Sequence, residues 1–308
     1  MKQILLLSAV AVLAGCGSGG GGGSAGGGGS ASVATVPFTS WSDVRPNTEI
    51  VASAISTEAT YTDNSVGTVT SLGRFTSYNG VEFRETFGPD GVITKASFTT
   101  GDGDRLVFDT AQGAAFAPIA NGLATVAASA DLSEIAIAVE PLPQGWNYQT
   151  FGVWQRSPTQ DRFGRIGAIS TGNFTASNNI PATGTATFSG VAAGAYQTPG
   201  GSGGGLVSAD MAVVVGFSDR VAGFATAGSV LSRDGGQTFS AAPGLDLSGS
   251  MQVANNQNLM SGTVRTSSGM TGDIYGKFYG PNAQEVGGTF GLTGSGVESY
   301  VGGFGGKR

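Results

Sequence analysis

The sequence predicts an all-β protein in which an irregular antiparallel domain precedes an eight-stranded, up-and-down antiparallel β-barrel. The 308-residue chain contains 54 Gly, and only 12% of its residues are charged. Apolar and polar residues alternate along many short segments, and Gly, Pro, Asn and Asp separate these segments. High Gly together with Thr, Ser, Val and Phe favours short strands and tight turns over helix bundles, and the length allows two modest domains.

The N-terminal segment carries a predicted lipoprotein signal peptide over residues 1–15. Met1-Lys2 supplies positive charge, and the apolar run 4–14 is too short to cross a bilayer core of ~30 Å as a helix. The run ends in Leu13-Ala14-Gly15-Cys16, which resembles the bacterial lipobox. The resemblance implies cleavage before Cys16 and acylation of that residue. The alternative, an ordinary secretory signal, leaves unexplained why the single cysteine of the chain stands at this point.

A flexible tether is expected over residues 16–35, beginning at the lipidated Cys16. The segment is almost entirely Gly and Ser, so it cannot pack and behaves as a random coil. Such a coil has a mean end-to-end distance on the order of 20–25 Å. The tether therefore holds a folded body clear of the lipid surface.

Residues 36–145 are expected to form the irregular β domain. The runs 67–72 and 81–87 alternate with period two, as half-buried strands do. The second run meets the turn signal Gly88-Pro89-Asp90-Gly91 and is followed by 92–98, which predicts a hairpin. The small apolar stretch 111–130 leaves room for a short helix, although Pro118 and Gly122 disfavour one.

Residues 146–308 are expected to form the barrel, because regular strands separated by turns can close and remove exposed sheet edges. Met211, Val213, Val215 and Phe217 share one face. About eight strands enclose an interior that side chains just fill, so we expect no roomy pocket inside the barrel. The candidate strands are 148–154, 184–188, 191–197, 206–217, 220–231, 245–253, 259–266, 272–279, 285–293 and 299–304.

Catalytic, cofactor and nucleic-acid functions find little support in the composition. The chain has no His, which excludes Ser-His-Asp and Cys-His catalysis, His-bound zinc and His-ligated haem. Gly-x-Ser-x-Gly occurs at 22–26 and 200–204, but both copies lie in glycine tracts. Asp102 and Asp104 fit a polar turn better than a calcium loop. The net charge of −6 without a basic cluster disfavours nucleic acid. We expect no enzyme activity, no cofactor and no nucleic-acid partner.

The C-terminal part resembles the lobes of transferrin-binding protein B. Residues 278–290 read Phe-Tyr-Gly-Pro-x-Ala-x-Glu-x-Gly-Gly-x-Phe, a run typical of the closing hairpin of that barrel, and 300–308 are similar to its last strand. Residues 181–190 and 148–154 resemble an early barrel hairpin and the strand before it. The resemblance implies a single-lobe surface lipoprotein with a handle domain, here residues 36–145, and one barrel.

The resemblance favours a lipid-anchored, non-enzymatic binding protein of the bacterial outer membrane, displayed on the cell surface. Its ligand would be a protein or a small solute, which an outer-membrane transporter could receive, and the lipid anchor would be its one membrane attachment. The residue after the cysteine is Gly17 and not the Asp that prevents sorting of lipoproteins to the outer membrane in some bacteria, so sorting to the outer membrane is favoured. The candidate contact loops are 155–179, 199–205 and 232–243, and the candidate ligand-binding residues are Arg156, Arg162, Phe163 and Arg165.

Two alternatives remain. The first is a structural or adhesive envelope lipoprotein that has no released ligand. The second is a small integral outer-membrane barrel, which would need an apolar outward band. That band is interrupted here, because Asp273, Lys277, Glu285 and Thr289 are predicted to point outward.

Overall fold

The computed structural model describes residues 33–160 and 163–308. The predicted signal peptide, Cys16 and most of the predicted tether lie outside the described residues. Within the described ranges the protein is built from β-strands joined by turns and 3-10 helices, and no helix there is long and apolar enough to cross a membrane. The 3-10 helices are η2 (Trp41–Asp43), η3 (Thr110–Gln112), η4 (Ala120–Gly122), η5 (Ser177–Asn179) and η6 (Pro243–Leu245).

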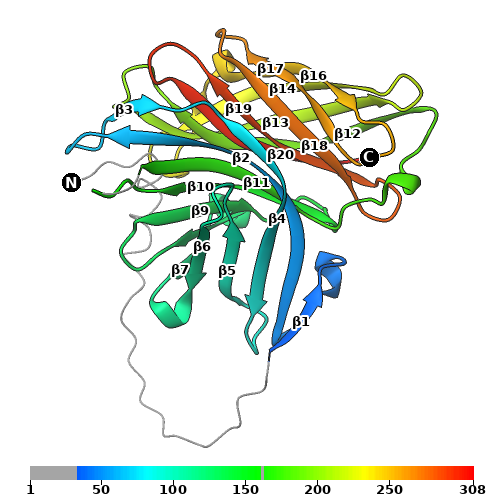
Figure 1. Ribbon diagram of the computed structural model, residues 1–308, viewed down its shortest axis with the longest axis horizontal. Helices are drawn as coiled ribbons and strands as arrows, with labels where there is room; N and C mark the ends of the chain where they lie inside the picture. The colour runs from blue at the N-terminus through cyan, green and yellow to red at the C-terminus, as the bar shows by residue number, and fades with distance from the viewer. Residues whose placement is uncertain (1–32, 161–162) are drawn as a thin grey trace, which may run out of the picture.

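The N-terminal half forms an 11-stranded sheet, called the first sheet, with the order β6-β5-β4-β2-β11-β10-β9-β8-β7. Strands β1 and β3 also pair with β2, and every pairing except β1 with β2 is antiparallel. In Figure 1 this sheet lies beneath the barrel and is strongly curved. Its strands are β1 (Ala34–Pro37), β2 (Thr48–Asp63), β3 (Val69–Leu72), β4 (Thr76–Phe87), β5 (Ile93–Thr99), β6 (Arg105–Asp109), β7 (Ala115–Ile119), β8 (Ala124–Ala128), β9 (Glu134–Val139), β10 (Gln149–Arg156) and β11 (Gly164–Gly172).

The C-terminal half closes into the barrel, in the order β13-β12-β20-β19-β18-β17-β16-β14, with β13 pairing back to β14. This ring of eight antiparallel strands confirms the predicted barrel, and the short β15 pairs with β14 outside the ring. The strands are β12 (Thr185–Gln197), β13 (Gly204–Gly216), β14 (Val221–Ser232), β15 (Ser240–Ala241), β16 (Leu247–Val253), β17 (Met260–Thr266), β18 (Thr271–Tyr279), β19 (Glu285–Thr293) and β20 (Ser299–Lys307).

The barrel interior is filled by large side chains, as the sequence predicts. Phe188, Phe278 and Phe290 are fully buried, and Phe290 meets Tyr300 edge to face at 4.9 Å between ring centroids. Edge-to-face packing suits the charge distribution of aromatic rings. The predicted inward row Met211, Val213, Val215 and Phe217 belongs to the same core.

Two expectations about strands need correction. The strand predicted at 148–154 forms as β10, but it pairs with β9 and β11 in the first sheet and not in the barrel. The segments 184–188 and 191–197 join into the single strand β12. Alternation shows which residues of a strand share a face. It does not show which sheet the strand joins, because strands of both sheets bury side chains and give similar patterns.

The short helix allowed within 111–130 is also corrected. The segment forms η3, β7, η4 and β8 instead of an α-helix. Pro118 lies in β7, which is an edge strand of the first sheet, where a missing backbone N–H is tolerated. Asn121 and Gly122 take positive φ angles of 56° and 82° and turn the chain back into β8.

The first sheet and the barrel pack through the outward face of β19 and β20, which we call the seating face: Gly287, Thr289, Gly291, Val301, Gly303 and Gly305. A methyl group added at Gly303 would lie 2.6 Å from Cδ2 of Phe151, and one at Gly291 would lie 2.5 Å from Cγ of Phe75. Each aromatic ring therefore rests directly on barrel backbone. Close approach of this kind requires Gly.

Polar contacts fix the register of this packing. Thr57 Oγ1 and Thr289 Oγ1 are 2.8 Å apart, and the carboxylate of Glu285 accepts hydrogen bonds from the backbone N–H groups of Asn147 and Tyr148. Lys277, Glu285 and Thr289 do point out of the barrel as predicted, but other parts of the chain cover them, so they are 7%, 3% and 0% exposed. Lys277 Nζ donates to the backbone oxygen of Asn258 and lies over the ring of Phe174. The outward face of β19 and β20 is thus an internal interface.

Substitution of a seating-face glycine tests this interface. Gly303→Ala is expected to lower the free energy of unfolding by about 1–3 kcal/mol, because its methyl group overlaps Phe151. The matched control is Gly223→Ala on β14, where an added methyl group has its nearest neighbour at 4.0 Å. Denaturant unfolding of both variants measures the difference, and equal effects would contradict the proposed tight seating.

Candidate functional site

The segment 155–179, predicted as a long contact loop, is mostly regular structure. It contains the end of β10, the whole of β11 and η5. The sequence did not reveal β11, because this strand has three Gly and one Ala among its nine residues and lacks a clear alternation of apolar and polar side chains. The candidate residues of this segment therefore have to be judged by their surroundings.

Arg156 and Arg165 lie together in a buried network of ion pairs. Arg165 Nη2 is 2.6 Å from Glu58 Oε2, and a second ion pair joins Arg165 to Asp102. Arg156 Nη1 is 2.8 Å from Asp104 Oδ2, and its Nη2 is 3.4 Å from Asp102 Oδ2. The two arginines are only 2% and 8% exposed. They connect β2, β10 and β11 to the turn between β5 and β6.

The acidic partners are held by further hydrogen bonds. Glu58 Oε1 accepts from Ser56 Oγ at 2.6 Å and from the backbone N–H of Gly101 at 2.8 Å. Burial disfavours the ionised form of Asp102, but a hydrogen bond from Thr100 and the nearby Arg165 outweigh it, so the pKa of Asp102 is lowered. The terminal nitrogens of both guanidinium groups pair with acidic residues of the same chain, which indicates a structural role for both arginines.

The other two candidate residues lie at the connection between β10 and β11. Phe163 is 63% exposed, whereas Arg162 lies outside the described residues. A ligand-binding role for the four candidates stays a prediction, and among Arg156, Phe163 and Arg165 only Phe163 presents its side chain to solvent.

The remaining predicted contact loops are partly built into the fold. In 199–205, the backbone oxygen of Gly201 accepts a hydrogen bond from Val69 N at 3.0 Å, which attaches the loop to β3. In 232–243, Asp234 accepts hydrogen bonds from Ser232, Gln237 and Thr238 and closes a compact turn. Phe239 in this second loop is 43% exposed.

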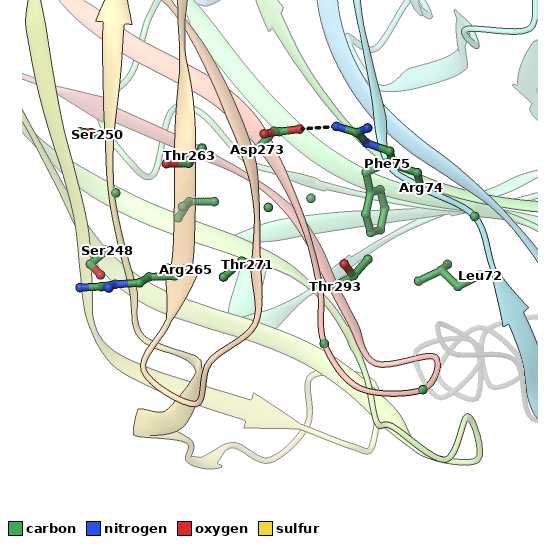
Figure 2. Close-up of a pocket in the computed structure, with 17 residues that line it drawn as sticks. Leu72, Arg74, Phe75, Ser248, Ser250, Thr263, Arg265, Thr271, Asp273 and Thr293 are labelled. Carbon is green, nitrogen blue, oxygen red and sulfur yellow. Dashed lines mark ion pairs between the residues drawn. The ribbon is translucent and has the colours of Figure 1, made fainter.

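A large polar hollow lies on the outside of the barrel, where the connection from β3 to β4 overhangs strands β16 to β19 (Figure 2). We call it the outer concavity. Its volume is about 1020 Å³. Its lining consists of Leu72, Gly73, Arg74, Phe75, Ser248, Gly249, Ser250, Thr263, Val264, Arg265, Thr271, Gly272, Asp273, Gly291, Thr293, Gly294 and Gly296.

The floor of the outer concavity is made of glycines and small hydroxyl side chains. Ser248, Ser250, Thr263, Thr271 and Thr293 offer donors and acceptors from neighbouring strands, and the glycines between them expose backbone. Such a surface suits hydrogen bonding to a polar polypeptide segment. No group of metal-ligating side chains was found among residues 33–160 and 163–308.

Charged groups stand at the rim of the outer concavity. Arg74 Nη2 is 3.9 Å from Asp273 Oδ2, and Figure 2 shows the two side chains pointing toward one another. Arg74 is 90% exposed, so this pair leaves its guanidinium open to a partner. Phe75, seated on Gly291, holds the overhang in place. The sequence did not reveal Arg74, Phe75 or Arg265, because residues 72–75 and 248–296 meet only in the folded chain.

The family of the barrel follows from its sequence. Residues 180–308 match the family model described as the C-lobe and N-lobe beta barrels of Tf-binding protein B (TbpB). The barrel is therefore TbpB-like. The match starts just before β12 and ends at the last residue, so it covers the eight-stranded ring and confirms the TbpB-like resemblance seen in the sequence.

Solved structures of TbpB are similar to most of this chain at low identity. A mutant TbpB from Haemophilus parasuis is 14% identical, over 83% of this chain and 58% of that chain, with a TM-score of 0.45. TbpB from serogroup B Neisseria meningitidis is 17% identical, over 76% of this chain and 53% of that chain, with a TM-score of 0.40. This chain thus spans little more than half the length of either protein.

A third solved structure, described as a surface lipoprotein, is 10% identical, over 82% of this chain and 98% of that chain, with a TM-score of 0.44. No curated protein is similar to this chain in sequence.

The effect of a substitution on the free energy of unfolding tests whether an arginine of the ion-pair network has a structural role. Arg165→Met is expected to lower the free energy of unfolding by about 3–5 kcal/mol, because it leaves the buried Glu58 carboxylate without its cation. Arg74→Met, at an exposed pair, is expected to change it by less than about 0.5 kcal/mol. Thermal or denaturant unfolding gives both values, and a tolerated Arg165→Met would argue against the structural role.

Proposed function

We propose that the protein is a lipid-anchored, non-enzymatic binding protein that captures a protein ligand on the outer surface of a bacterial outer membrane. The observation that carries the proposal is the match of residues 180–308 to the TbpB barrel family. The family's name states a protein ligand for its members. The lipobox-like Leu13-Ala14-Gly15-Cys16 supports the anchor, and the Gly/Ser tether supports display away from the lipid.

The outer concavity is the surface we propose for ligand contact. It is broad, and its floor offers many hydrogen-bonding groups at small side chains, while Arg74 and Arg265 provide cations at its edge. Arg is enriched at protein interfaces because its fork of donors pairs with carboxylates and carbonyls. A protein loop with acidic and polar residues fits this chemistry. The absence of His and of a free Cys beyond position 16 in the sequence supports a role without catalysis.

The anchor is tested by substitution of the proposed acylation site. In cells grown with labelled palmitate, the wild-type protein is expected to carry the label. Protease treatment of intact cells is expected to degrade the protein, because it is displayed on the surface. Cys16→Ser is expected to remove the label and to release the protein from the membrane, whereas Ser18→Ala keeps both properties. Retention of Cys16→Ser in the membrane fraction would contradict the lipid anchor.

Ligand capture is tested with purified transferrin and lactoferrin as probes for the Cys16→Ser chain in surface plasmon resonance. Binding of at least one probe is expected. Arg74→Glu combined with Arg265→Glu is expected to weaken it about tenfold or more, as loss of an interface anchor does. Arg45→Glu changes the charge at another exposed arginine, far from the outer concavity in sequence, and is expected to leave affinity unchanged. Equal affinity of the double variant and the control would remove the outer concavity as the contact surface.

A further inference from the structure

A second cavity, which we call the inner cavity, lies within the curved first sheet. Its volume is about 480 Å³, within the range of pockets for small organic ligands. Aromatic side chains from β4 to β10 form much of its wall: Phe83, Phe87, Phe98, Phe108, Phe116 and Trp154. It is separate from the outer concavity, with which it shares no lining residue.

The inner cavity has a mouth at the surface of the protein. Val92, in the turn between β4 and β5, is 58% exposed, and Leu142, in the segment after β9, is 62% exposed. Both side chains also line the cavity. Exposed apolar residues beside an apolar pocket are typical of ligand-binding openings.

Glu85 is buried in the wall of the inner cavity without a partner. It stands on the inward face of β4 between Phe83 and Phe87, and it is 9% exposed. Among the described residues, its carboxyl group makes no hydrogen bond or ion pair. Burial raises the pKa of Glu85 to about 8, and the negative charge of Glu140 adds to the effect. A buried polar group without a partner is unfavourable, and a bound ligand is one way to supply the missing partner.

Glu140 is the second carboxyl group of the inner cavity, and one of its oxygens accepts a hydrogen bond from Thr125 Oγ1 at 2.5 Å. The lining contains no Lys or Arg. On the strands that flank Glu85, the charged residues Glu49 and Lys95 lie on the opposite face of the sheet, where they pair with Arg84 and Asp109. Glu85 and Glu140 are therefore the only charged groups of the described chain that line the cavity.

The indole group of Trp154 adds an unpaired donor. Trp154 is fully buried and lines the inner cavity, and its Nε1 has no hydrogen-bond partner among the described residues. The cavity therefore offers acidic groups and aromatic faces, and the unpaired indole N–H is enclosed within its wall.

We propose that the inner cavity binds a small organic cation with an apolar body, placing its cationic group beside Glu85 and Glu140. The aromatic walls favour this occupant twice, because they bury its apolar part and their ring faces attract cations. An anion would be repelled by the negative charge of Glu140, and by Glu85 whenever that group is ionised. A plain hydrocarbon would leave Glu85 without a partner. This site goes beyond the protein-ligand function proposed for the barrel, so the two proposals stand or fall separately.

The binding of a permanent cation is expected to depend on pH. In the free protein Glu85 stays protonated up to about pH 8, and a bound cation favours its ionised form, so binding releases a proton. Affinity is therefore expected to be at least about tenfold higher at pH 9 than at pH 6.

The stability of the free protein provides an independent readout of Glu85. Because the folded-state pKa is raised, unfolded chains lose this proton at lower pH than folded ones. The contribution of Glu85 to stability is therefore fully present below its ordinary pKa of 4.5 and falls as pH rises toward about 8. Glu85→Gln is expected to remove this decline.

The experiment uses the full chain carrying Cys16→Ser and isothermal titration calorimetry with three probes that share one ring system: naphthylmethyl-trimethylammonium, naphthylmethanol and naphthylacetate. The ammonium probe is expected to bind at least about tenfold more tightly than the alcohol, and the carboxylate is expected not to bind. Repeating the titration in buffers of different ionisation enthalpy measures the released proton.

Two variants and one control identify the site. Glu85→Gln is expected to weaken binding of the ammonium probe about tenfold and to remove its pH dependence. Glu82→Gln makes the same charge change on the outer face of β4, beside Arg84, and is expected to leave binding unchanged. Ala136→Phe is expected to abolish binding by filling the cavity from β9.

Three outcomes would overturn the proposal: no binding of the ammonium probe, equal binding of the ammonium and alcohol probes, or an affinity that Glu85→Gln and Glu82→Gln change equally. Unfolding curves of each variant show that it is folded, so loss of binding can be assigned to the cavity.

Discussion

The close contact between the first sheet and the seating face of the barrel is the constraint on which the rest of the structure depends. Aromatic rings from the first part of the chain lie directly on backbone at Gly291 and Gly303 because no side chain stands between them. Strands β10 and β11 are then buried on both faces, one toward the inner cavity and one toward β19 and β20. The same contact fixes where the β3–β4 connection overhangs the barrel, and so creates the outer concavity.

The glycine-rich end of the chain therefore meets two separate packing requirements. On the outward side, Gly303 and Gly305 accommodate Phe151 and Trp146. On the inward side, Gly288 and Gly302 leave room for Phe304 and Phe290, which fill the barrel. Successive residues of a strand point to opposite faces. A run of adjacent glycines therefore removes side chains from both faces and lets aromatic rings contact the backbone on each side.

Buried charges in the first sheet show how local context decides the role of a polar residue. Arg156 and Arg165 resemble interface anchors in the sequence, yet each is neutralised by acidic residues from distant strands. Glu85 attracts no notice in the sequence, since it falls in an alternating strand beside Arg84. In the folded protein Arg84 pairs with Glu49 and Glu82 on the outer face, whereas Glu85 faces the aromatic interior without a partner. Removing one partner of a buried ion pair destabilises a fold, whereas an unpaired carboxyl group that lines a cavity can gain a partner from a ligand.

Period-two alternation, turn residues and the motif at 278–290 were enough to predict the all-β class, the eight-stranded barrel and its family, because these features depend on local chemistry and on which residues share a face. The same information did not show that β10 and β11 join the first sheet, that Lys277 and Glu285 are covered, or that 111–130 forms two strands. The outer concavity and the inner cavity are also invisible in the sequence, since each is lined by segments far apart in the chain. Such features depend on pairings between distant strands, and only the tertiary structure decides which of the available partners each strand and each charge meets.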